Sequence, residues 1–386
     1  MTWETGKKIV LMYDGAASLY AGAEMFFINA ATELSKHGFS VTLVDREDSI
    51  IPRHLVDHGV PFSFVPFRKG RRIPLPGRYD YLLVTNTKIF HCCRLGLNWD
   101  CKVLVVEIDK DFWDDRHGND SVFHRISNWS MRRWRQSMID KAGLSVLEAS
   151  ACRLAADRGY RNVDRMALVP LMAPDIPEHS RIRRMPDGSG KWRFLGIARD
   201  TEYKIAPLAY FFPRIRALIP NSVFKFVTHN TEHAKAIFEN FGVDFVECVP
   251  GMPPEELNGY MDREADCVVA MGTTSINAAT LGIPTLVGDA TNEWPYPTDK
   301  FRWVHDSHEN LGEYITSKAK PSYGITVAHA VEDLKSSYEG LSKAAIDFVA
   351  KRHSPDVFAE SMMAALASSK VSFIRYRVMT KIGVLR

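Results

Sequence analysis

The sequence lacks the cysteine patterns that mark a disulfide-stabilised or zinc-binding protein. Its six cysteines include no Cys-x-x-Cys pair, and no cysteine and histidine lie at zinc-site spacing. Scattered cysteines are typical of a reducing cytosol. The chain also has no convincing metal-binding acidic pair of the Asp-x-Asp type. We therefore expect no metal and no cofactor.

Long hydrophobic runs are also missing. No apolar stretch approaches the roughly 20 residues of a membrane span. The first residues, Met1 to Lys8, are too polar and charged for a signal peptide. We therefore expect a cytoplasmic protein whose membrane contact can only be peripheral, on the inner face.

An excess of charge of one sign is absent as well. The 49 basic and 46 acidic residues leave a net charge of +3. A balance this even argues against a protein dedicated to nucleic-acid binding. The composition, 46% hydrophobic and 25% charged, is that of a globular protein, and 386 residues suffice for two cores.

The first half of the chain alternates between strand and helix patterns. Lys8 to Tyr13 forms a short apolar strand, Ala23 to His37 has helical spacing, and Phe39 to Val44 forms the next strand. Such a βαβ unit predicts a parallel sheet covered on both faces. Further apolar strands are predicted at residues 81–84, 103–106, 144–147 and 166–169.

The second half repeats this alternation after a proline-rich interruption. Prolines at 170, 174, 177 and 186, followed by Asp187-Gly188-Ser189-Gly190, predict an interdomain linker. New strands are then predicted at residues 192–197, 223–227, 244–248, 267–270 and 284–287. The fold class is therefore α/β with two Rossmann-like domains and a cleft between them.

The predicted domain limits follow from this pattern. Residues 1–172 form an N-terminal domain and residues 190–352 form a C-terminal domain. Residues 353–386 are predicted to form a C-terminal helix and a basic tail that pack back on the N-terminal domain.

The turn after the first strand is rich in small residues. It runs from Gly15 to Gly22 and ends next to Glu24, at the start of the first helix. Small residues let a ligand approach the backbone, and a helix N-terminus favours an anion. The turn is not Gly-x-Gly-x-x-Gly, so the dinucleotide-binding fingerprint is missing. A tight turn without a ligand remains the alternative.

The first strand of the second domain is followed by two cations. Arg199 and Lys204 lie five residues apart in the segment Gly196 to Lys204. Two cations on a loop that faces the cleft suit a pyrophosphate, whose charge must be neutralised as a leaving group. The alternative is a pair of solvated surface cations.

A later segment combines a buried strand with hydroxyl residues. After Ala270 come Thr273, Thr274, Ser275 and Asn277, at the start of a short helix that Gly282 ends. Backbone N–H groups and these hydroxyls suit a phosphate or a ribose. The alternative is a Ser/Thr helix cap, which uses the same donors.

These motifs together resemble the GT-B glycosyltransferases, specifically the glycosyltransferase family 4 or group 1 type. Gly22-Ala23-Glu24 matches the end of the glycine-rich first loop of that family. Gly196 to Lys204 is similar to its Gly-x-Arg…Lys motif, and Asn277 to Pro284 to its Glu-Ala-x-Ala-x-Gly-x-Pro segment. The resemblance covers about residues 8 to 350, mostly by pattern.

The resemblance implies a metal-independent transfer of a sugar from a nucleotide-diphosphate sugar to a glycan or lipid-linked acceptor. Arg199 and Lys204 would hold the donor diphosphate, Thr273 to Asn277 the phosphate or ribose, and the N-terminal domain the acceptor. The family setting implies surface polysaccharide biosynthesis.

The chain departs from the family at two glutamates that normally lie eight residues apart. Asn277 occupies the second position, and the first has no counterpart. A catalytically silent GT-B-like binding protein therefore stays open as an alternative. A nucleotide-sugar epimerase is a further one, and a nucleotide-dependent dehydrogenase is more remote because the glycine fingerprint is missing.

Two carboxylates follow the strand at residues 103–106. Asp109 falls where many relatives carry a histidine that faces the donor sugar, and Glu107 lies two residues earlier. A carboxylate there suits a general base on an acceptor hydroxyl. We predict this role for Asp109, with Glu107 in reserve; the alternative is that both cap the following acidic loop.

Three stretches are rich in basic residues, and two of them also contain aromatic residues. They cover residues 68–72, 125–135 and 373–381. Basic and aromatic residues together favour contact with an anionic membrane surface. A solvated basic face is the alternative for each stretch taken singly.

Overall fold

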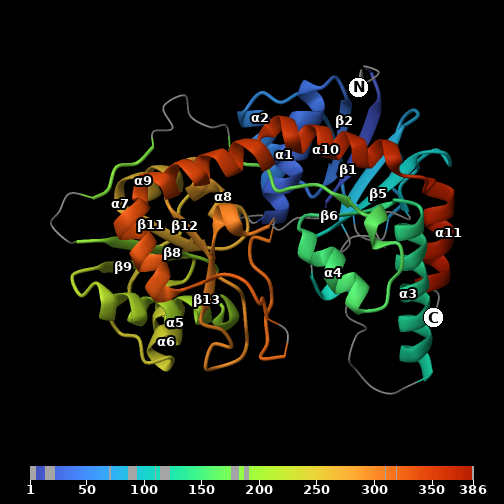
Figure 1. Cartoon of the computed structure of the whole chain (residues 1–386). Coiled ribbons are helices and arrows are strands. Elements are labelled where there is room, and N and C mark those ends of the chain that lie inside the picture. The colour runs from blue at the N-terminus through green and yellow to red at the C-terminus, as the bar shows by residue number, and fades with distance from the viewer. Residues whose placement is uncertain are drawn as a thin grey trace. The chain divides into compact units, whose positions relative to one another are not determined.

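The structure is a computed structural model that folds into two compact units. It describes residues 6–13, 22–68, 71–85, 94–108, 110–113, 122–174, 182–186, 191–308, 310–318 and 320–384. One unit comprises Met1–Pro170 with Asp356–Arg386, and the other comprises Leu171–Pro355. Each is an α/β unit with its own sheet (Figure 1).

The first unit is built on a parallel sheet with the strand order β3-β2-β1-β4-β5-β6-β7. Its strands are β1 (Lys8–Met12), β2 (Ser40–Asp45), β3 (Ser63–Pro66), β4 (Tyr81–Thr85), β5 (Lys102–Glu107), β6 (Leu144–Val146) and β7 (Ala167–Leu168). The six strands predicted from continuous apolar runs are confirmed. β3 was not predicted, because it is an exposed edge strand without such a run.

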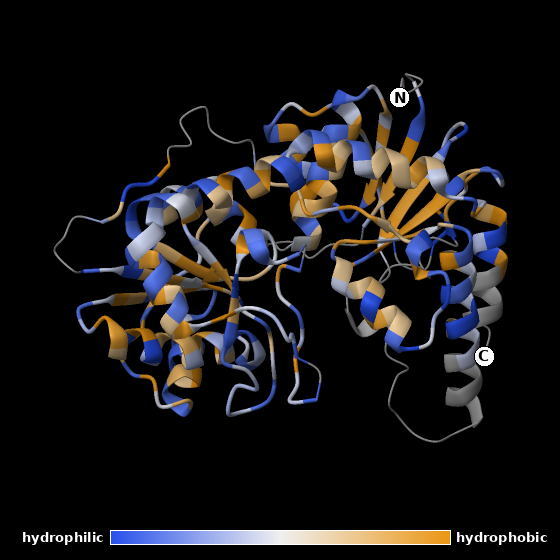
Figure 2. Ribbon diagram, in the orientation of Figure 1, coloured by the Kyte–Doolittle hydropathy of each residue, from blue (hydrophilic) through white to orange (hydrophobic). Residues whose placement is uncertain are grey.

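The core of this unit consists of the buried central strands and the helices that cover them. Val103 to Val106 in β5 are fully buried, as a strand covered on both faces requires. The strands of this sheet are accordingly hydrophobic along most of their length (Figure 2). The helices are α1 (Gly22–Lys36), α2 (Ile50–Asp57), α3 (Val122–Asp140), α4 (Ala149–Asp157) and the 3-10 turns η3 (Lys110–Trp113) and η4 (Val163–Arg165).

The C-terminal helices α10 (Pro355–Ser368) and α11 (Phe373–Val384) belong to the first unit. The backbone N–H of Val103 donates to the carbonyl of Val371 at 2.8 Å, and that of Phe373 donates to Cys101 at 2.7 Å. Phe373 and Tyr376 are buried in the same core. The end of the chain thus extends the hydrophobic core of the first unit.

The second unit has the strand order β10-β9-β8-β11-β12-β13-β14. Its strands are β8 (Arg193–Ile197), β9 (Val223–Thr228), β10 (Glu247–Pro250), β11 (Cys267–Ala270), β12 (Thr285–Val287), β13 (Lys300–Trp303) and β14 (Ile325–Thr326). The first five strands pair in parallel, whereas β13 is antiparallel to both of its neighbours. Four of the five predicted strands are confirmed, and β10 begins three residues later than predicted.

The helices of the second unit lie in the connections between these strands. They are α5 (Glu202–Leu218), α6 (Thr231–Asn240), α7 (Pro254–Glu264), α8 (Thr273–Thr280), α9 (Val327–Arg352) and the 3-10 turn η5 (Val304–Asp306). In the part of the chain that the structure describes, no helix has the length and hydropathy of a membrane span.

Arg183, from the predicted linker, fastens two of these helices. Its guanidinium donates to the carbonyl of Leu281 at 3.1 Å and to that of Ala265 at 3.2 Å. These are the C-cap residues of α8 and α7. Because the last carbonyls of a helix lack partners within it, the guanidinium stabilises both helix ends. The far end of α8 is thereby held in place.

Burial of His353, just beyond α9, predicts that stability depends on pH. Its Nδ1 donates to the carbonyl of Leu171 at 2.7 Å, and Nε2 has no partner among the described residues. Burial lowers the pKa of His353 to about 4. The unfolded imidazole titrates near 6.5, so only the unfolded state gains a proton as pH falls from about 6.5 to about 4.

We therefore expect His353 to cost stability progressively across that window, by up to about 3 kcal/mol. Urea unfolding at about pH 7 and about pH 4.5 measures this loss. It should shrink in His353→Gln and persist in His58→Gln, which removes an exposed histidine. An unchanged loss in His353→Gln would contradict the assignment.

Candidate functional site

Each sheet has a point at which the strand order reverses. In the second unit, β8 lies between β9 and β11, so the connections from β8 and β11 leave in opposite directions. In the first unit, β1 has the same position between β2 and β4. Ligands of open α/β sheets bind beyond the carboxyl ends of the strands at such a switch point. These two edges are the candidate sites (Figure 1).

At the switch point of the second unit, the loop after β8 carries Arg199. Arg199 is exposed, and its guanidinium has no partner among the described residues. Lys204 is half-buried in the first turn of α5 and lines a small hollow together with Met271. The loops that follow β8 and β11 therefore meet at this edge.

The loop after β11 ends in an uncapped helix. Gly272 is the N-cap residue of α8, and no side chain of the described residues caps this end. The Ser275 hydroxyl instead donates to the Gly272 carbonyl at 2.6 Å. The Ser/Thr cap that the sequence left open as an alternative is therefore not formed. The first N–H groups of α8 remain available to an anion.

Gly272 shapes this loop through its backbone. Its φ of 62° and ψ of −138° lie in a region that L side chains rarely adopt. A Cβ added there would meet no atom within 4 Å. Backbone conformation, not lack of space, therefore requires glycine at the start of α8.

Asn277 presents a polar atom in the second turn of α8. Its Oδ1 is buried and has no hydrogen-bond partner among the described residues. A buried acceptor without a partner costs roughly 1–3 kcal/mol. A ligand hydroxyl that donates to Oδ1 would recover this cost, as the sequence analysis expects of a ribose.

A buried ion pair, which the sequence analysis did not predict, supports the loop after β11. Asp289 and Arg302 are both almost fully buried and form an ion pair. The Glu313 N–H donates to Asp289 Oδ1 at 2.8 Å, and the Gly272 N–H donates to the Leu311 carbonyl. The ion pair thus holds the strand-like segment that contacts the start of α8. Burial raises the pKa of Asp289, and the Arg302 charge opposes this shift.

A second interaction beside Arg199 was also not predicted. Asp200 Oδ2 lies 3.0 Å from Nδ1 of His233, in the first turn of α6. The hydrogen bond with His233 lowers the pKa of the Asp200 carboxyl. This pair ties the loop that bears Arg199 to α6.

In the first unit, buried polar side chains gather at the corresponding edge. Asp45, Thr85 and Glu107 are the last residues of β2, β4 and β5, and all three are buried. The Tyr13 hydroxyl, just beyond β1, donates to Glu24 Oε1 at 3.0 Å. Glu24 Oε2 is buried without a hydrogen-bond partner among the described residues. Polar groups are therefore concentrated where an α/β sheet binds its ligand.

Some of the predicted site residues of the first unit lie among the described residues, and others do not. Gly22 begins α1, and Glu24 lies in its first turn. Gly15 and Asp109 lie outside the described residues. Glu107, the reserve candidate for the general base, is the last residue of β5 and is only 4% exposed.

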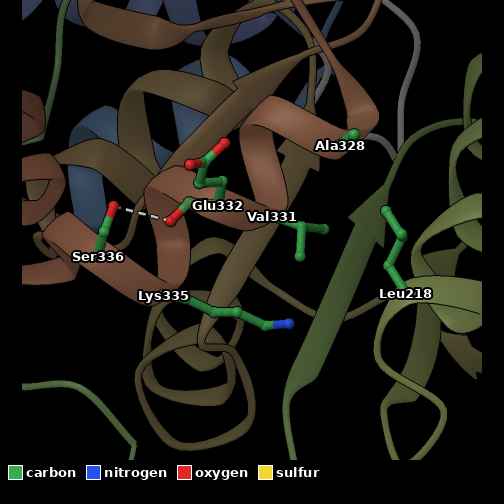
Figure 3. Close-up of a pocket in the computed structure, with 6 residues that line it drawn as sticks. All are labelled: Leu218, Ala328, Val331, Glu332, Lys335 and Ser336. Carbon is green, nitrogen blue, oxygen red and sulfur yellow. Dashed lines mark hydrogen bonds between the residues drawn. The ribbon is translucent and has the colours of Figure 1, made fainter.

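The larger hollow of the second unit lies elsewhere. It has a volume of about 380 Å³, and Leu218 at the end of α5 lies opposite Ala328 and Val331 of α9 (Figure 3). Leu218 and Lys204 are at opposite ends of α5, so this hollow is on the amino side of the strands. It contains none of the predicted site residues. In the described part of the chain, no three His, Cys, Asp or Glu residues are grouped to hold a metal.

Comparison with known proteins yields structural matches only. No protein-family model and no curated protein matches the sequence. Anabaena HepE, solved in complex with UDP and glucose, is 11% identical with a TM-score of 0.57, covering 94% of this chain and 100% of that chain. The lipopolysaccharide outer core galactosyltransferase WaaB is 10% identical with a TM-score of 0.56, covering 94% and 99%.

A third match carries a different activity in its name. The N-terminal domain of a Candida albicans trehalose-6-phosphate phosphatase is 10% identical with a TM-score of 0.58, covering 95% of this chain and 98% of that chain. At such identities the similarity establishes the fold and leaves the chemistry to the site. The two sheets, their switch points and these matches confirm that the chain has the GT-B fold, the two-Rossmann-domain fold of glycosyltransferases.

Proposed function

We propose that this protein is a metal-independent glycosyltransferase that moves a sugar from a nucleoside-diphosphate sugar to a glycan or lipid-linked acceptor. The observation that carries the proposal is the switch point of the second unit. There, an unpaired exposed arginine follows β8, and the uncapped N-terminus of α8 follows β11. Both supply hydrogen-bond donors for a diphosphate, which carries two negative charges, and they follow adjacent strands.

The donor diphosphate would lie between these groups. Arg199 and Lys204 would neutralise its charge, and the N–H groups and hydroxyls of Thr273 and Thr274 would bind its oxygens. Ser275 would act by shaping the loop, because its hydroxyl is engaged by Gly272. Asn277 Oδ1 would accept a hydrogen bond from a ribose hydroxyl. Charge that develops on the leaving diphosphate as the glycosidic bond breaks would thus be stabilised by fixed donors.

The acceptor would bind to the first unit. Gly22 and Glu24 lie at the helix start by the switch point beside β1, where Tyr13 and Glu24 form a buried polar pair. Gly15 is proposed from the sequence alone to contribute to the same acceptor site. Asp109 would take the proton from the attacking acceptor hydroxyl, with Glu107 as the reserve candidate. The acceptor oxygen would then replace the diphosphate on the anomeric carbon.

The structural matches support the choice of donor and setting. Anabaena HepE was solved with UDP and glucose, and WaaB is named a lipopolysaccharide outer core galactosyltransferase. We infer a nucleoside-diphosphate sugar as donor and surface polysaccharide biosynthesis as setting. The transfer reaction would take place in the cytoplasm, and the protein would contact the inner face of the membrane peripherally.

A silent binding protein is the second candidate. Asn277 favours this candidate, because it stands where the family that the sequence resembles has a glutamate. The amide of Asn277 is neutral and cannot supply the charge of that glutamate. Such a protein would bind a nucleoside diphosphate without turnover.

The test is turnover with a panel of nucleotide sugars, measured as nucleoside diphosphate released with and without simple glycans and lipid-diphosphate sugars as acceptors. We expect one donor to react, with release stimulated by an acceptor and a new glycosidic product by mass. Arg199→Ala should abolish release, whereas Arg184→Ala, at an exposed arginine of the same unit, should not. Binding of a diphosphate without turnover under any condition would favour the silent protein, and acceptor-independent conversion would favour an epimerase.

A further inference from the structure

We propose that the outer faces of α3 and α11 form a docking surface for an anionic lipid bilayer. Its members are Trp129 and Arg133 of α3, Ile374, Arg375 and Val378 of α11, and Trp99 in the turn before β5, here called the α3–α11 surface. The inference specifies the membrane contact of the proposed function, but it stands on separate observations in the first unit.

The two helices share an unbalanced charge. α3 contains Arg125, Arg132, Arg133 and Arg135 against one carboxylate, Asp140, at its last position. α11 contains Arg375, Arg377 and Lys381 and no carboxylate. Since the whole chain has 49 basic and 46 acidic residues, this imbalance is local.

The helices lie side by side, so their charges add. The rings of Trp134 and Tyr376 are 6.2 Å apart, and α3 and α11 run next to each other in Figure 1. Two arginines of α3 are engaged within the first unit: the buried Arg135 donates to the Tyr160 hydroxyl, and the exposed Arg132 donates to the Arg158 carbonyl. Arg133 and Arg375 are exposed and face away from the core.

Large apolar side chains are exposed among these cations. Trp99 is 71% exposed, Trp129 57%, Val378 48% and Ile374 37%. Ile374 and Val378 are one helical turn apart on α11, and the Ile374 N–H donates to the Trp99 carbonyl at 3.1 Å. The Arg133 guanidinium lies 4.7 Å from the Trp129 ring. Tryptophan and apolar residues thus alternate with cations on one surface.

The structure narrows the membrane hypothesis to the exposed residues of the basic stretches at 125–135 and 373–381. Trp134, Phe373 and Tyr376 are at most 3% exposed and anchor the two helices to the core. They are therefore unavailable to a membrane, and the exposed set above replaces them.

A lipid surface fits this combination better than a nucleic acid does. Tryptophan concentrates at the membrane–water interface. Lysine and arginine near the surface of an anionic bilayer are attracted to it. Asp100, the carboxylate next to Trp99, is paired with Arg78 and adds little repulsion. The phosphate backbone of a nucleic acid offers charge but no apolar surface, so it would leave the exposed tryptophans in contact with water.

The experiment is co-sedimentation of the full chain with vesicles of phosphatidylcholine alone or mixed with phosphatidylglycerol. We expect binding only to the mixed vesicles, weakened by added salt. Arg133→Glu with Arg375→Glu should weaken the partition coefficient at least about tenfold. Trp99→Ser with Trp129→Ser should weaken it similarly. The controls Arg184→Glu and Trp294→Ser change an exposed arginine and tryptophan of the second unit and should have no effect.

Several results would overturn the proposal. They are equal binding to both vesicle types, unchanged binding in both double variants, or retention on duplex DNA without vesicle binding. Unaltered thermal unfolding and nucleotide binding of the variants would exclude misfolding as the cause. Since vesicle binding needs no turnover, a protein that binds vesicles but transfers no sugar would sink the proposed function and leave this surface intact.

Discussion

Asp289→Asn should lower the free energy of unfolding by about 3–5 kcal/mol. The substitution preserves the shape of the side chain and an oxygen for the Glu313 N–H, which donates to Asp289 Oδ1 at 2.8 Å. It removes the only carboxylate that Arg302 contacts in the described residues. Arg302 is 2% exposed, so an uncompensated charge would remain buried. Urea unfolding measures the change.

The double variant Asp289→Asn with Arg302→Met is the matched control. If the loss arises from an unpaired buried charge, removal of that charge should restore at least half of it, because apolar replacement of a buried pair is often neutral. A loss below about 1 kcal/mol in the single variant would contradict this account. So would an equal loss from Asp289→Asn in the Arg302→Met background, because the pair would then be uncoupled.

Asp109→Asn should reduce kcat of the transfer by about 10²–10⁴-fold while leaving donor binding unchanged. An amide has the shape of the carboxylate but cannot take a proton from the acceptor hydroxyl. The proposed diphosphate site lies in the other unit, so the thermal shift caused by the nucleotide should persist. The measurement is turnover at saturating donor and acceptor.

Two substitutions serve as comparisons. Asp111→Asn changes the carboxylate two residues further on, in η3, and should change kcat by no more than a few-fold. Glu107→Gln tests the reserve candidate, which ends β5 and is buried. Full activity of Asp109→Asn together with loss in Glu107→Gln would transfer the role of general base to Glu107. Full activity of both would remove this edge of the sheet from the chemistry.

The parallel strands were predictable because they are buried on both faces. The sequences of β5 and β11 are continuous apolar runs, and a short run of this kind is typical of a strand buried on both faces. β13 was missed because Arg302 breaks its pattern. A buried arginine is compatible with a strand only when a carboxylate such as Asp289 pairs with it, and periodicity does not register that partner.

The candidate site divides in the same way. Arg199, Thr273 and Asn277 could be proposed from the sequence because each follows a predicted strand, and parallel strands align their carboxyl ends. The Asp200–His233 and Asp289–Arg302 pairs could not. Their partners are 33 and 13 residues apart and meet only through the packing of separate elements.

The central claim is that the switch point of the second unit binds a nucleoside diphosphate, and a thermal-shift screen tests it most directly. Uridine, guanosine, adenosine, cytidine and thymidine diphosphates would each be added to the protein, to Arg199→Ala and to the control Arg184→Ala. At about 100 times its dissociation constant, a bound diphosphate adds about 2.7 kcal/mol. The account predicts stabilisation by one of them that disappears in Arg199→Ala and persists in Arg184→Ala. No shift with any diphosphate, or an equal shift in Arg199→Ala, would contradict it.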